Sequence, residues 1–104
     1  MDSVELIRNI KAEIDALVNQ YSEGAAGQTE LGIKLDSLDL NPEQKRQVVD
    51  LIKQAIEEST YNLLSAFEGS ASLNGSQECY TIIDEQGNEV SGKLDTVFYE
   101  QVME

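Results

Sequence analysis

The chain contains no histidine and only one cysteine among its 104 residues. The absence of histidine removes the side chain that most often acts as a general base near neutral pH. It also removes the commonest metal ligand, and a single cysteine cannot complete a structural zinc site. Nucleophile pairs of the Ser–His and Cys–His types are excluded within this chain for the same reason. We therefore expect a protein that is not an enzyme and that uses no cofactor.

The chain also lacks a long apolar run, because no segment approaches the roughly 20 apolar residues that a membrane-spanning helix needs. Its single cysteine, Cys79, cannot form an internal disulfide, which favours a reducing compartment. The first residues, Met1 to Glu5, show neither the basic nor the apolar region of a secretory signal. Together these features predict a cytoplasmic protein that makes no membrane contact.

Basic residues are scarce: 7 stand against 20 acidic residues, for a net charge of -13. The excess is uneven, since residues 1–56 carry -4 and residues 57–104 carry -9, with Lys93 as the only basic residue of the second segment. Such a field repels nucleic-acid phosphates and anionic lipid and attracts basic surfaces. Two interpretations stay open. The acidic surface either keeps the protein soluble or steers a basic protein partner towards it.

Length and composition fit one domain covering residues 1–104, since the size is typical and 40% of residues are hydrophobic. A helix is predicted from about residue 3 to 21, where apolar residues recur at spacings of three and four. This stripe consists of Ile7, Ile10, Ile14, Leu17 and Tyr21. Residues 22–30 lose the pattern and predict a loop. Residues 31–35 alternate apolar and polar side chains, which indicates a short strand or an apolar tether over the core.

A second, longer helix is predicted from residue 42 to residue 67 or 68. Asn41 suits the N-cap, Pro42 suits the first helical position and Gln44 can close a capping box. Its expected apolar stripe is Val48, Leu51, Ile52, Ala55, Ile56, Leu63 and Phe67, with Val49, Tyr61 and Leu64 beside it. Gly69 can end the helix.

The C-terminal part predicts a β-hairpin followed by a short helix. Cys79 to Ile83 have strand propensity, Asp84 to Asn88 are turn residues, and Glu89 to Ser91 resume an extended segment. The turn opens like a calcium loop, but its glycine comes fourth from Asp84 and not sixth, so a hairpin turn is preferred. Within the expected strand, Cys79 is interpreted as a buried core residue.

The last helix is expected from Lys93 to Met103, with Leu94, Val97 and Phe98 on its apolar face. The predicted fold class is therefore α+β and helix-dominant. Two long antiparallel helices are expected, with the β-hairpin and the short C-terminal helix covering one side. The run from Tyr61 to Asn88 resembles short bacterial proteins in its general residue pattern. It carries no motif of a characterised family, and no functional residue is transferred to it.

The functional hypothesis that follows is a non-catalytic acidic module that binds an unknown, basic protein. An inhibitor of the immunity type, which neutralises a basic toxin or nuclease, would have this size and charge. Acidic groups next to tyrosines could make such an interface, and the candidate partner-binding residues are Glu85, Glu89, Tyr99 and Glu100. Nucleic acid and membrane are excluded as partners on charge.

The alternative hypothesis is a self-associating structural protein. The helical stripe from Ile7 to Tyr21 could form the seam of a homodimer. The same stripe could instead pack inside its own chain, which is the interpretation that we favour. The two are distinguished by salt, because apolar burial is not screened whereas attraction between charges is.

Overall fold

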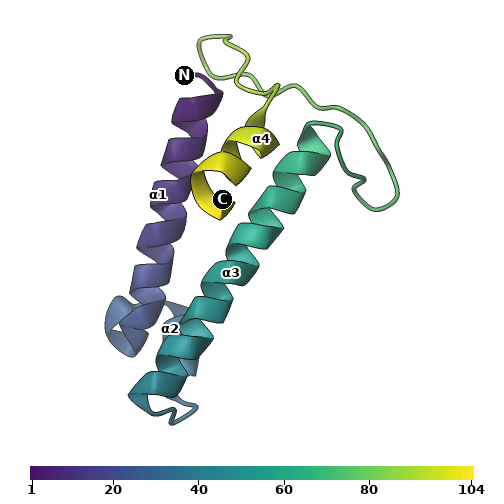
Figure 1. The fold of residues 1–104 in the computed structure, drawn as a ribbon. Helices are drawn as coiled ribbons and strands as arrows, with labels where there is room; N and C mark the ends of the chain where they lie inside the picture. Colours follow the sequence, from purple (N-terminus) through teal and green to yellow (C-terminus); the bar gives the residue numbers. More distant parts are fainter. The chain divides into compact units, whose positions relative to one another are not determined.

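The computed structural model describes residues 1–104 and is built from helices, turns and irregular segments (Figure 1). None of its helices combines the length and the apolar character that crossing a membrane requires. In chain order the elements are α1 (Ser3–Ser22), the 3₁₀ turn η1 (Gly24–Gly27), α2 (Glu30–Asp36), α3 (Pro42–Phe67), α4 (Leu94–Phe98) and the π-helical turn η2 (Tyr99–Met103).

The contacts of the chain group it into two compact units, which are described separately. Unit 1 consists of Met1–Lys11 and Glu57–Glu104, and unit 2 consists of Ala12–Ile56. Each long helix contributes residues to both units. The prediction of one domain over residues 1–104 is not tested by this grouping and stays a prediction.

The two long helices begin where the sequence predicted, and side chains cap the first turn of each. At α1, the Asp2 carboxylate accepts a hydrogen bond from the Glu5 amide at 2.9 Å. At α3, Asn41 and Gln44 form the expected capping box. The Asn41 side-chain oxygen accepts from the Gln44 amide at 2.8 Å, and the Gln44 side-chain oxygen accepts from the Asn41 amide at 3.1 Å. Two otherwise free amides are thereby paired, one at each end of the box. The predicted bounds of both helices are confirmed to within one residue.

The α+β class and the β-hairpin are wrong, because the structure is 64% helical and contains no β-strand. The expected strands meet only in one isolated bridge between Ile83 and Glu89. A two-stranded hairpin is marginal without a third strand, and none is present to extend it. The Asp84 carboxylate also accepts hydrogen bonds from the backbone amides of Gln86 and Asn88, and these bonds compete with strand pairing.

Because the hairpin does not form, the expectation that the one cysteine is buried is also wrong. Cys79 is exposed, and its thiol donates weakly to the Glu68 carbonyl oxygen at 3.7 Å. Without a sheet beneath it, the segment from Cys79 to Ile83 lies largely at the surface of unit 1. Strand propensity describes side chains that fit a half-buried pleated surface, and here that surface is missing.

Residues 31–35 belong to a helix, so both the strand and the tether expected for them are wrong. The Thr29 hydroxyl caps α2 by accepting a hydrogen bond from the Gly32 amide at 2.9 Å. In a helix, residues four apart share a face. Leu35 is accordingly buried and Leu31 half-buried, while Ile33 between them is exposed.

The apolar stripe expected on α3 is centred on the wrong residues. Leu51 is 65% exposed and Leu63 is also exposed, whereas Val49 and Leu64, placed beside the stripe, are buried. The buried face of α3 is therefore rotated relative to the predicted one. Apolar residues occur on both sides of this helix, so the sequence pattern alone does not identify its buried face.

The core of unit 1 fixes the C-terminal helix. Phe98, Leu94 and Ile7 are fully buried. The Glu68 carboxylate at the end of α3 accepts hydrogen bonds from the Gly92 amide at 2.8 Å and from the Leu94 amide at 2.7 Å. A carboxylate at this position satisfies amides at the start of α4 and complements the helix dipole. The predicted helix from Lys93 to Met103 is observed as α4 followed by η2.

Candidate functional site

The C-terminal turn of unit 1 borders an open hollow of about 450 Å³. Its lining consists of Tyr61 from α3, Thr96 from α4, Tyr99 and Glu100 from η2, and Glu104. Thr96, Tyr99 and Glu100 are three and four residues apart and therefore share one helical face. Phe98 is fully buried beneath this segment. The hollow is thus formed by the exposed face of a helix whose other face is anchored in the core.

Two tyrosine rings form one wall of the hollow. The centroids of the Tyr61 and Tyr99 rings lie 5.8 Å apart, and the ring planes are inclined by 56°. This distance is within the range of favourable aromatic pairs. Tyr99 is 47% exposed and Tyr61 is half-buried. Neither phenolic hydroxyl forms a hydrogen bond with another protein group, so both are free for a ligand.

The charge of the hollow is negative. The carboxylates that line the hollow belong to Glu100 and Glu104, and no lysine or arginine lines it. Neither carboxylate takes part in an ion pair or a side-chain hydrogen bond within the chain. Ionised carboxylates are strong hydrogen-bond acceptors, so these oxygens are available to a cationic donor group.

Two hollows of unit 2 differ from this one in charge. Asp15 and Lys53 line the first, and Lys45, Arg46 and Asp50 line the second. Each combines both signs of charge, so neither would select strongly for a cation or an anion. The hollow of unit 1 is distinguished from them because all of its charged side chains are acidic.

The structure places the four predicted partner-binding residues at two locations. All four are exposed, but only Tyr99 and Glu100 line the hollow. The Glu85 carboxylate accepts a hydrogen bond from the Gln86 side-chain amide at 3.4 Å, and the Glu89 carboxylate accepts one from the Ser91 hydroxyl at 3.2 Å. A binding role for the four residues stays a prediction.

The candidate list omitted three of the residues that line the hollow, Tyr61, Thr96 and Glu104. A sequence signal exists for Thr96, because the spacing from Thr96 to Tyr99 and Glu100 places the three on one helical face. For Tyr61, the proximity to Tyr99 depends on the packing of α3 against the C-terminal helix. That contact has no local sequence signal.

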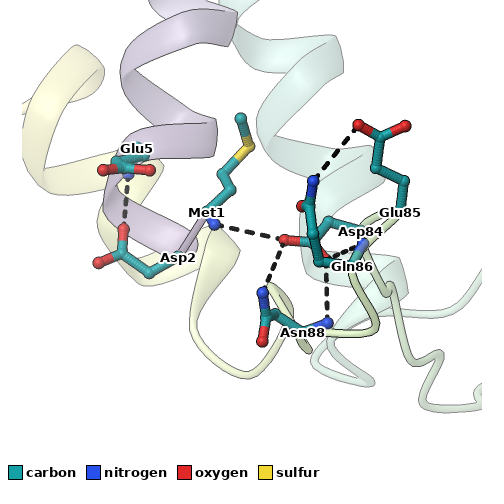
Figure 2. Close-up of polar contacts among 7 residues, drawn as sticks. All are labelled: Met1, Asp2, Glu5, Asp84, Glu85, Gln86 and Asn88. Carbon is teal, nitrogen blue, oxygen red and sulfur yellow. Dashed lines mark hydrogen bonds and ion pairs between the residues drawn. The ribbon is translucent and has the colours of Figure 1, made fainter.

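Glu85 lies in a turn that Asp84 organises (Figure 2), and Glu89 directly follows Asn88 at the end of this turn. One Asp84 carboxylate oxygen accepts from the Gln86 and Asn88 amides at 3.0 and 2.9 Å. The other lies 3.4 Å from the Asn88 side-chain nitrogen and 3.3 Å from the Met1 amino group. These hydrogen bonds, above all that from the Asn88 amide, hold the pKa of Asp84 below its ordinary value.

The lowered pKa of Asp84 predicts an acid-dependent loss of stability. A carboxyl whose pKa is lower in the folded state stabilises the fold above its unfolded pKa, and this contribution is lost as pH falls through the folded value. We expect Asp84→Ala to be less stable than wild type at pH 7 in urea unfolding. The difference between the two proteins should shrink below about pH 4.

Glu85→Ala is the matched control for this experiment, because it removes a neighbouring exposed carboxylate that caps no backbone amide. It should leave the free energy of unfolding at pH 7 nearly unchanged. A difference between wild type and Asp84→Ala that is constant from pH 7 to pH 2.5 would contradict the prediction.

The chain contains no group of three histidine, cysteine, aspartate or glutamate side chains placed to hold a metal ion. Comparison of the chain with protein-family models, with curated proteins and with solved structures gives no match.

Proposed function

We propose that the chain is a non-catalytic acidic protein-binding module whose unit 1 binds a basic protein. The observation that carries this proposal is the excess of carboxylates in unit 1, which the lysine and arginine side chains of the unit leave unpaired. Its residues include 12 acidic and 3 basic side chains, for a net charge of -9. Arg8, Lys11 and Lys93 are its basic residues, and none of them forms an ion pair with a carboxylate. Unpaired surface charge of one sign attracts and orients a partner of the opposite sign.

Unit 2 provides the contrast within the same chain. It has 8 acidic and 4 basic residues, for a net charge of -4. Two of its basic side chains are paired, Lys45 with Asp36 at 3.3 Å and Arg46 with Glu43. A surface that served only solubility would not need most of the unpaired charge on one unit. The separation of charge supports binding by unit 1, and an inhibitor of the immunity type is the form of binding protein that we propose.

The proposal includes a cytoplasmic location, supported by the single, unbridged Cys79. Self-association is the competing proposal, and one of its supports is weakened. Ile7 and Ile14, which belong to the apolar stripe of α1, are buried within the chain itself. Side chains that are already covered contribute little to a dimer seam.

The proposal is tested with a triple variant, Glu85→Lys, Glu89→Lys and Glu100→Lys. Wild type and variant are used as tagged baits in extracts of the native host, eluted stepwise with salt, and the partner is identified by mass spectrometry. Binding of the purified partner is then measured by calorimetry. We expect a basic protein that leaves wild type at moderate salt and binds the variant about tenfold to a hundredfold more weakly.

The matched control reverses three exposed carboxylates of unit 2 that form no hydrogen bonds, by Glu13→Lys, Asp15→Lys and Asp50→Lys. It changes the net charge equally and should retain most of the binding. Circular dichroism checks that all proteins are folded. Equal loss in both variants would show that net charge alone matters. A bait recovered alone as a salt-resistant dimer would overturn the proposal in favour of self-association.

A further inference from the structure

We propose that the hollow lined by Tyr61, Thr96, Tyr99, Glu100 and Glu104 binds one arginine side chain of the partner. This inference rests on the proposed function, since it names the group through which unit 1 recognises a basic protein. Its volume of about 450 Å³ lies within the range of small-ligand sites. The hollow is therefore large enough to hold an extended side chain.

The aromatic wall favours a flat cation. Tyr61 and Tyr99 both line the hollow, with ring centroids 5.8 Å apart and planes inclined by 56°. A guanidinium group stacks on an aromatic ring and is attracted by its quadrupole when it lies within about 6 Å of the centroid. An ammonium group is more strongly hydrated and lacks the plane that stacks. The two rings therefore favour arginine over lysine.

The carboxylates supply the opposite charge. Glu100 and Glu104 have no partner within the chain, and a guanidinium offers five donors in a fixed planar arrangement that matches a carboxylate. An anionic ligand would be repelled by both groups. A neutral ligand would remove water from the carboxylates without replacing its hydrogen bonds, which is costly.

The hollow is held in place before the partner arrives. Phe98 and Leu94 are fully buried on the opposite face of the helix that carries Tyr99 and Glu100. The Glu68 carboxylate fixes the start of α4 through the Gly92 and Leu94 amides. A site whose residues are already ordered loses less conformational entropy on binding. The C-terminal helix thus presents its lining residues in the arrangement that an arginine would meet.

The test uses capped hexa-arginine, hexa-lysine and hexa-glutamate peptides, added to ¹⁵N-labelled protein at low salt and followed by NMR. We expect saturable shifts with hexa-arginine that are largest at Thr96, Tyr99 and Glu100. Hexa-lysine should bind several-fold more weakly. Tyr99→Leu, which leaves the charge unchanged, should weaken hexa-arginine binding by about threefold to tenfold, and Glu100→Gln should weaken it similarly.

Tyr80→Leu is the matched control, because Tyr80 is an exposed tyrosine of unit 1 that lies outside the hollow. It should leave hexa-arginine binding unchanged. Equal binding of both basic peptides, unaffected by Tyr99→Leu, would overturn the arginine site and leave the proposed function standing. If neither basic peptide binds better than hexa-glutamate, the proposed function itself fails. The shifts of the wild-type protein decide the question even if a variant does not fold.

Discussion

Replacement of Phe98 by alanine is expected to lower the free energy of unfolding by about 3–5 kcal/mol. Phe98 is the largest fully buried side chain of the structure, with 0% of its surface exposed. Removing it deletes its contacts and leaves a cavity between helices that cannot close completely. Urea unfolding monitored by circular dichroism measures the loss. A domain of this size has a total stability of about 5–15 kcal/mol, so the variant should lose a large part of it.

Tyr99→Ala is the control for this experiment, since the neighbouring aromatic residue is 47% exposed and contributes mainly to the hollow. Its truncation should cost less than about 1.5 kcal/mol. A loss below about 1 kcal/mol for Phe98→Ala would show that the C-terminal helix is not packed as described. The two variants therefore separate the stability of unit 1 from the function proposed for its surface.

The parts of the fold that could be predicted from the sequence are those with local signals. The bounds of α1 and α3 follow from capping residues and helical periodicity, and the Asn41–Gln44 capping box forms as expected. The β-hairpin, which was predicted wrongly, would depend on contacts between distant residues. The segment from Cys79 to Ile83 has strand propensity but finds no sheet, so it stays irregular.

The candidate site was predicted in part for the same reason. Glu100 and Tyr99 could be selected from charge and residue type, and the structure places them together. Glu85 and Glu89 have the same chemistry but lie in, and directly after, the turn that Asp84 organises. The contribution of Tyr61 required knowledge of which turn of α3 faces the C-terminal helix. Composition identified the kind of surface, whereas tertiary packing determined which residues form one hollow.

Replacement of Gly32 by alanine is a case in which local and tertiary effects predict opposite results. Gly32 lies within α2, where alanine has a helix propensity about 1 kcal/mol more favourable than that of glycine. Propensity alone therefore predicts stabilisation. The structure predicts the opposite, because a β-carbon at Gly32 would collide with the carbonyl oxygen of Gly24 and lie 2.8 Å from the Thr29 hydroxyl.

We expect the collision to dominate, so that Gly32→Ala lowers the free energy of unfolding by about 1–3 kcal/mol. The Gly24 oxygen belongs to the backbone and cannot rotate away, and the Thr29 hydroxyl is the N-cap acceptor for the Gly32 amide at 2.9 Å. Any relaxation that makes room for the methyl group therefore weakens the cap of α2 as well. Ile33→Ala, at an exposed position of the same helix, should change stability by less than about 0.5 kcal/mol. A stabilised Gly32→Ala variant would mean that the close approach of Gly24 to α2 is absent in solution, and that α2 is held by its own propensity and cap alone.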